Sequence, residues 1–335
     1  MDGEWDRLPE SARAWLEAVR RHPVVQGVLL AGGCGRGDLW PGSDVDLWVV
    51  SDQERCPDLG RPEVGERFAD VHHVSIAALG RLIAEPDAFA ASPLVDETAG
   101  GVPLHDPDGL LRRWLDAVSG RLADPGVWAA RARARLTAAR DALDGAQADP
   151  DPLERALLAR DAARLGAWAY TAGRGGLVTS ARRFADRFLA NCVPDIGRAF
   201  VQAWNLGGGR AEVDAAITSL RLALASALEM ASRHPHREDE PSWVKGWRDS
   251  APPERAAFLA RHPLPLLLAP TMARGYYSGA LMWMRGYYRL GFKGLLAALP
   301  PDERPVAALW RFHGLTGDEQ ASCRRLLDLV GATLP

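Results

Sequence analysis

Hydrophobic and polar positions follow two different periods in the first third of the chain. Apolar residues recur at helical spacing from Pro9 to Arg21, and β-branched runs then follow at Val24–Ala31, Asp44–Val50 and Ala69–Ile76. Gly, Pro or Asp residues, which interrupt regular structure, bound each run. The pattern predicts one helix followed by three neighbouring strands of one sheet.

Two more helices are expected after these strands. Ile76–Ala84 returns to helical spacing until Pro86 ends it, and Leu110–Leu122 forms a helix after the turn Asp106-Pro107-Asp108-Gly109. Asp, Pro and Gly are ordinary turn and N-cap residues, so we interpret this turn as structural and not as a metal site.

Helical periodicity dominates beyond about residue 125. The segments with this spacing are Trp128–Leu143, Leu153–Tyr170, Ala181–Asn191 and Arg210–Arg233, which predict an all-α bundle. The charged, Pro-bounded segment His234–Pro241 is the best linker candidate. We therefore expect an α+β domain over residues 1–123, a small mixed sheet with flanking helices, followed by a helical region over 124–335 with an optional sub-boundary near 234–241.

Composition narrows the functional classes. The 335 residues suffice for about two domains at roughly 150 residues each. Forty basic against 43 acidic residues give a net charge of −3, which argues against nucleic acid as a partner. The apolar runs are too short to cross a membrane, the N-terminus is acidic, and the four cysteines are scattered. These features predict a cytoplasmic protein with reduced thiols.

The segment between the first two strands carries the candidate chemistry. Gly32 and Gly33 directly follow a strand, and Asp44 and Asp46 stand two residues apart on the next one, so both carboxylates share a face. Two negative charges at such a short distance are tolerated mainly when a cation lies between them. The pair therefore indicates a divalent metal. A short helix beginning at Gly33 would present free N–H groups to a triphosphate.

Three short motifs resemble a known family. Ala31-Gly32-Gly33, Gly35-Arg36-Gly37 and Ser43-Asp44-Val45-Asp46 resemble the pattern of nucleotidyltransferases of the DNA polymerase β superfamily, especially the aminoglycoside adenylyltransferase-like branch. The one departure is Gly35, where the family usually has Ala. The resemblance covers about the first 110 residues, and the helical region resembles the family's C-terminal domain only in character.

The resemblance implies roles for individual residues. Asp44 and Asp46 would bind two Mg²⁺ ions with a nucleoside triphosphate, and Asp70 would complete the metal site and help to activate the acceptor hydroxyl. Glu66 or His72 is the alternative to Asp70. His72 and His73 are adjacent on a strand, so they point to opposite faces and cannot both line one site.

The same resemblance implies where the triphosphate binds. Gly32 and Gly33 would approach it through the backbone, and Arg36 and Ser43 would contact its oxygens. Some family members take a general base from the helical region, where Glu154 and Asp161 are the options, although both are expected to be solvated charges. The aromatic residues Tyr276, Tyr277, Trp283, Tyr287, Tyr288 and Phe292 are expected to pack, with an acceptor-binding wall as the alternative.

The implied function is a Mg²⁺-dependent nucleotidyltransferase. It would move a nucleoside monophosphate, AMP from ATP in the first place, to a hydroxyl of a small, aminoglycoside-like acceptor and release pyrophosphate. The alternative is an antitoxin-type or protein-modifying regulatory module. An RNA-tailing role ranks third, because the chain shows no basic stripe.

Overall fold

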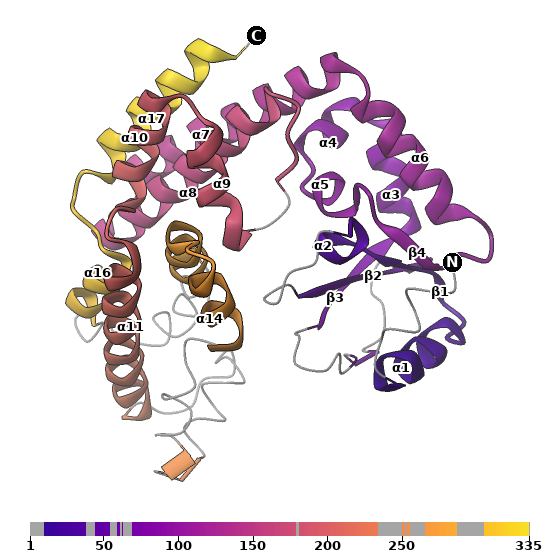
Figure 1. Cartoon of the computed structure of the whole chain (residues 1–335), viewed down its shortest axis with the longest axis horizontal. Helices are drawn as coiled ribbons and strands as arrows, with labels where there is room; N and C mark the ends of the chain where they lie inside the picture. The colour runs from indigo at the N-terminus through magenta and orange to yellow at the C-terminus, as the bar shows by residue number, and fades with distance from the viewer. Residues whose placement is uncertain are drawn as a thin grey trace. The chain divides into compact units, whose positions relative to one another are not determined.

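A computed structural model describes most of the chain (Figure 1). The described residues are 10–37, 44–53, 59, 60, 62, 69–178, 181–233, 250, 251, 253, 254, 265–286 and 305–334. The chain divides into two compact units, the first with residues 1–136, 168–180 and 333–335, the second with residues 137–167 and 181–332. The domain boundary after residue 123 stays a prediction, and the segment 234–241 lies outside the described residues.

The first unit is built on a small mixed sheet. Its strands are β1 (Val25–Leu30), β2 (Val45–Ser51), β3 (Ala69–Ser75) and β4 (Val102–His105), in the spatial order β3-β2-β1-β4. β1 pairs antiparallel with β2 and with β4, whereas β2 and β3 run parallel. The expected mixed sheet is confirmed, and the three predicted strands lie where the sequence pattern put them.

β4 is the strand that the sequence pattern did not assign. Pro103 lies within it and pairs with Leu29 of β1. A proline has no N–H for a strand ladder, so it argues against a central strand and is tolerated at a sheet edge. β4 occupies such an edge, which reconciles the proline with the sheet.

Four helices cover one face of the sheet (Figure 1). They are α3 (Ile76–Ala84), α4 (Pro86–Ala91), α5 (Leu94–Thr98) and α6 (Leu110–Leu122). Their core joins the sheet residues Leu29 and Val50 to the helix residues Phe89, Leu111 and Trp114, all buried. Burial of one such side chain stabilises the fold by about 1.5–3 kcal/mol.

The opposite face packs on α1 (Glu10–Arg20). Leu16 and Val19 of this helix form a buried cluster with Val28 of β1 and Val49 of β2. The even-numbered residues of β2 therefore face α3–α6 and the odd-numbered ones face α1, as strand alternation requires.

Capping residues set the helix ends in this unit. The Ser75 hydroxyl accepts a hydrogen bond from the backbone N–H of Ala78 (3.1 Å) at the start of α3, and Pro86 opens α4. The Asp106 carboxylate accepts from the backbone N–H groups of Leu111 (2.9 Å) and Arg112 (3.1 Å). The interpretation of this turn as capping chemistry is confirmed for Asp106.

Beyond residue 122 the described residues contain helices and no strand. They are α7 (Pro125–Ala148), α8 (Pro152–Ala172), α9 (Ala181–Asn191), α10 (Pro194–Trp204), α11 (Gly209–Ser232), α14 (Pro265–Ala273), a helix over 277–286, α16 (Val306–His313) and α17 (Glu319–Thr333). The expectation of a mostly helical region is confirmed, and α10 is an addition. Within the described part of the chain, no helix has the length and apolar character needed to span a membrane.

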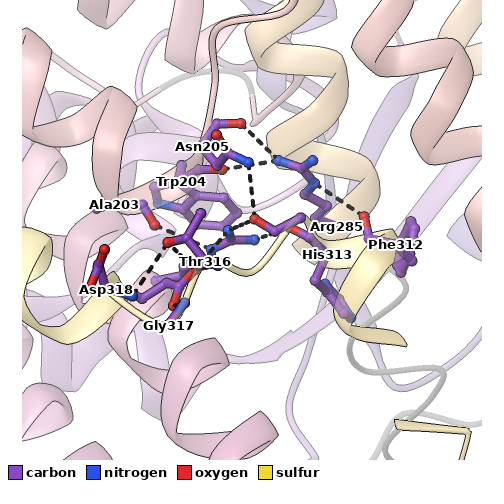
Figure 2. Close-up of polar contacts among 12 residues, drawn as sticks. Ala203, Trp204, Asn205, Arg285, Phe312, His313, Thr316, Gly317 and Asp318 are labelled. Atoms are coloured by element: carbon purple, nitrogen blue, oxygen red, sulfur yellow. Dashed lines mark hydrogen bonds and ion pairs between the residues drawn. The ribbon is translucent and has the colours of Figure 1, made fainter. Parts of the chain in front are cut away.

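Two buried arginines, Arg160 and Arg285, join several helices of the second unit; Figure 2 shows the contacts of Arg285. The Arg160 guanidinium donates to the backbone carbonyls of Ala203 (3.2 Å), His313 and Gly314 (2.8 Å). The Arg285 guanidinium donates to those of Trp204 (3.0 Å), Asn205 (3.2 Å) and Phe312 (3.4 Å). These carbonyls end α10 and α16, so the arginines satisfy acceptors that have no partner within a helix.

Each of these arginines also has a carboxylate partner. Glu319 lies 3.4 Å from Arg160 and Glu212 lies 3.2 Å from Arg285. Burial, followed by the charge of Arg285, lowers the pKa of Arg160 to about 9, while the two glutamates oppose that shift. Arg160 therefore remains charged at neutral pH, and two buried cations are matched by two carboxylates.

Candidate metal centre

Three potential metal ligands converge on the sheet face that packs against α3–α6. One ligand atom from each of Asp46, Asp70 and His72 lies within 4.8 Å of the other two. Asp46 of β2 pairs directly with Asp70 of β3, and His72 stands two residues further along β3. Residues two apart on a strand share a face, so strand register alone brings these groups together.

Trp48 fixes the orientation of the His72 ring. The two residues pair across β2 and β3, and their rings stack with centroids 4.6 Å apart and planes 20° apart. His72 Nε2 lies 3.5 Å from Asp70 Oδ2. His73, the next residue, is exposed, as expected of a residue on the opposite face.

Gly32 makes room for the Asp46 carboxylate. A Cβ atom at Gly32 would overlap Oδ2 of Asp46, and the backbone there has φ +60°, a left-handed conformation that favours glycine. The short helix α2 (Gly32–Gly35) begins at this residue, one position before the expected Gly33. Gly33 is its second residue, and Gly32 lies directly against the Asp46 carboxylate.

The structure explains the one departure from the family motif. A Cβ atom at Gly35 would overlap the carbonyl oxygen of Leu30 and lie 2.9 Å from the Cα of Gly101. The turn is therefore packed between the end of β1 and the chain entering β4. An alanine at Gly35 would force these segments apart.

Asp44 lies just before β2, two residues from Asp46. Its backbone carbonyl accepts a hydrogen bond from the Cys34 thiol at 3.2 Å, which ties the start of β2 to α2. The group of three close ligand atoms does not include Asp44, whose role as a metal ligand stays a prediction. Ser43, the expected triphosphate contact, and Glu66, the alternative to Asp70, lie outside the described residues.

Arg36 contacts the end of α5. Its Nη1 donates to the backbone carbonyls of Asp96 (3.3 Å), Glu97 (3.5 Å) and Ala99 (3.3 Å). A guanidinium at the C-terminal end of a helix satisfies carbonyls that lack intrahelical donors. Arg36 thereby joins α2 to α5, and its expected contact with a triphosphate stays a prediction.

A buried ion cluster anchors α5 and was not predicted from the sequence. Asp96 Oδ2 accepts from Arg131 (2.6 Å) and from Arg135, and Oδ1 accepts from the backbone N–H of Val178 (3.2 Å). Burial lowers the pKa of Arg131 to about 10, against the charge of Asp96. Arg131 and Arg135 stand four residues apart on one face of α7, the only local signal of this pair.

Glu97, the residue after this anchor, brings a further carboxylate near the cluster. Loss of hydration raises the pKa of Glu97, the charge of His72 opposes that shift, and three carboxylates add to it, those of Asp46, Asp96 and Asp70. The sequence does not indicate that Glu97 lies near the three potential ligands, because its local pattern is that of an ordinary charged residue on a helix.

The candidates from the helical region lie in the second unit. Glu154 and Asp161 belong to α8, where Asp161 forms an ion pair with Arg164 (3.4 Å). Tyr276 precedes the helix over 277–286, which carries Tyr277 and Trp283. The other expected aromatic residues, Tyr287, Tyr288 and Phe292, lie outside the described residues.

Comparison with known families assigns the region that contains the cluster. Residues 12–82 match the family model described as "Nucleotidyltransferase domain". This region is therefore similar to a nucleotidyltransferase domain. The match includes Gly32, Asp46, Asp70 and His72 and ends within α3. No curated protein matches the chain.

The cluster in this segment fits a divalent cation. Carboxylate and imidazole groups are common ligands of such ions, and three of them meet at one point of a rigid sheet. The space beside Gly32, which a Cβ would fill, lets the Asp46 carboxylate turn toward the glycine backbone. A cation at this point would therefore lie next to the turn where a phosphate is expected.

Proposed function

We propose that the protein is a metal-dependent nucleotidyltransferase that transfers AMP from ATP to a hydroxyl group of a small-molecule acceptor. The proposal rests on one observation: Asp46 and Asp70 meet beside Gly32, within the segment that matches the nucleotidyltransferase domain. Two carboxylates at such a short distance repel each other, and a bound cation removes this repulsion. The resemblance in the motifs favours Mg²⁺, with two ions.

The bonds change in one displacement. The acceptor oxygen forms a bond to the α-phosphorus of ATP, the bond from that phosphorus to the bridging oxygen breaks, and pyrophosphate leaves. A bound metal supplies charge neutralisation on the phosphate oxygens. The protein's main task is positioning, because phosphoryl-type transfer needs little covalent chemistry from side chains.

Each expected residue has a part in this proposal. Asp44, just before β2, and Asp46 of β2 help to hold the metal, and Asp70 completes the site and accepts the proton of the attacking hydroxyl. The triphosphate binds at the α2 turn, where the proposed contacts are Gly32, Gly33, Arg36 and Ser43. The acceptor is a polyhydroxylated molecule of the aminoglycoside type.

A labelling screen tests the proposal. The full-length protein is incubated with each α-³²P-labelled nucleoside triphosphate and with aminoglycosides, total RNA or lysate protein. We expect label from ATP on a small molecule, and no label on RNA. Label on a protein instead would favour the protein-modifying alternative.

Two aspartate variants assign the activity to the site. Asp46→Asn keeps the side-chain shape and removes a charge that would hold the metal, so we expect transfer to be abolished. Asp52, exposed just past the end of β2, provides the matched control, and Asp52→Asn should retain transfer. Equal activity of both variants would contradict the assignment of the site.

A further inference from the structure

The cluster contains a nitrogen donor as well as oxygen donors. Asp46 and Asp70 offer carboxylate oxygens, and His72 offers an imidazole nitrogen within the same 4.8 Å group. Strand alternation and register place His72 on the same sheet face as both carboxylates. The imidazole nitrogen is therefore one of three atoms that are close enough together to bind one ion.

Donor chemistry distinguishes the ions that such a set prefers. Mg²⁺ is a hard ion that takes oxygen ligands and keeps several waters. Imidazole is a good ligand for first-row transition metals, whose affinity for nitrogen-containing sites exceeds that of Mg²⁺. Replacing one carboxylate or water by His72 shifts the preference toward the transition metals.

The packing around His72 preserves this position. Trp48 stacks on the imidazole, although its own indole Nε1 is buried and has no hydrogen-bond partner among the described residues. A buried polar atom without a partner costs about 1–3 kcal/mol, so the tryptophan is not held there by its N–H group. The tryptophan contributes to the site through the face of its ring. This face stacks on the His72 imidazole and restricts the rotation of that ring.

We infer that His72 is a nitrogen ligand of the metal and that the site selects a divalent transition metal over Mg²⁺. This inference rests on the proposed function, which requires a divalent cation at Asp46 and Asp70 but not a particular one. The sequence predicts a site made of carboxylates alone, whereas the inferred site has two carboxylates and one imidazole. Trp48 acts as a positioning residue that holds the ring toward the ion.

Electron paramagnetic resonance with Mn²⁺ as the probe reads the ligand directly. Full-length protein loaded with Mn²⁺ should show a ¹⁴N hyperfine coupling, which becomes a ¹⁵N coupling when the protein is labelled with ¹⁵N-histidine. The coupling should vanish in His72→Ala and persist in His73→Ala, the control on the opposite face of the same strand. Circular dichroism checks that both variants are folded.

Competition between Mn²⁺ and Mg²⁺ measures the selectivity. Removing His72 should weaken Mn²⁺ binding about tenfold or more, the scale on which ligand-sphere changes alter metal affinity. Mg²⁺ binding should change much less, so the ratio of the two affinities falls toward one. His73→Ala should leave the ratio unchanged.

The outcomes separate this inference from the proposed function. Suppose that Mn²⁺ binding depends on Asp46 but the spectrum shows no histidine coupling. This result would overturn the inference about His72 and would leave the proposed metal-dependent function standing. Mn²⁺ binding that is indifferent to Asp46→Asn, together with no nucleotide transfer, would overturn both. If His72→Ala does not fold, His72→Gln takes its place, and the wild-type ¹⁵N measurement alone already decides whether a histidine binds the ion.

Discussion

The arginine network of the second unit and the carboxylate cluster of the first unit differ in how they balance charge. In the second unit, the buried cations Arg160 and Arg285 meet backbone carbonyls and the carboxylates of Glu319 and Glu212. In the first unit, carboxylates gather on one sheet face, and Glu97 responds with a raised pKa that follows from loss of hydration and from neighbouring negative charge.

This difference separates structural charges from functional ones. A buried cation matched by carbonyls and carboxylates stabilises the packing of helices and has no need of a ligand. Carboxylates placed next to one another cost stability unless a cation joins them. The carboxylate cluster in the segment that matches the nucleotidyltransferase domain is therefore distinguished by the negative charges that the fold brings close together.

The largest expected effect on stability lies in the second unit. Glu319→Gln removes the negative charge beside Arg160, and breaking a buried pair by changing one partner costs about 3–5 kcal/mol. Urea unfolding measures the change in free energy. Glu229→Gln is the matched control, because Glu229 pairs with Arg233 at 3.5 Å on the exposed surface, where a pair contributes about 0–1 kcal/mol. Equal losses would remove the contrast between the two kinds of charge.

Gly32→Ala should have an intermediate effect on stability. A left-handed backbone costs a non-glycine residue about 1–2 kcal/mol, and the new methyl group must also displace Asp46. A misplacement of about 1 Å can cost roughly a hundredfold in rate, so transfer should fall by that amount.

Gly175→Ala isolates the effect of backbone strain. Gly175 has φ +72°, and a Cβ atom there would meet nothing within 4 Å. This variant should lose similar backbone stability and retain transfer. If Gly32→Ala retained transfer as well, the close approach of Gly32 and Asp46 would have no part in catalysis.

The smallest expected effect concerns the stability of Asp46→Asn without metal. The substitution removes one of the neighbouring negative charges, so the free energy of unfolding in EDTA should stay within about 0.5 kcal/mol of the wild type or rise. Chemical denaturation in EDTA measures it. A loss on the scale expected for Glu319→Gln would show that Asp46 is a structural charge instead.

Local pattern was enough to predict the framework of the site. The β-branched runs and their breakers predicted β1, β2 and β3, and strand alternation put Asp46 and the adjacent histidines on defined faces. Asp70 was predicted from the family motif, and its pairing with Asp46 is a matter of strand register.

Long-range packing could not be predicted in the same way. Asp96 binds Arg131, Arg135 and Val178, which are 35, 39 and 82 residues away, and no local period signals such contacts. The contact of Arg36 with the end of α5 was likewise not predicted, because it joins residues 60 positions apart. β4 was missed because its proline is acceptable only at an edge, and edge position is a property of the whole sheet.

Calorimetric titration of the full-length protein with a non-hydrolysable ATP analogue tests the central claim most directly. The account predicts binding in the presence of Mn²⁺ or Mg²⁺ that is lost in EDTA, and an Asp46→Asn variant in which the metal no longer strengthens binding. Equal affinity of the wild type for the nucleotide with metal and in EDTA would contradict the metal centre at Asp46 and Asp70.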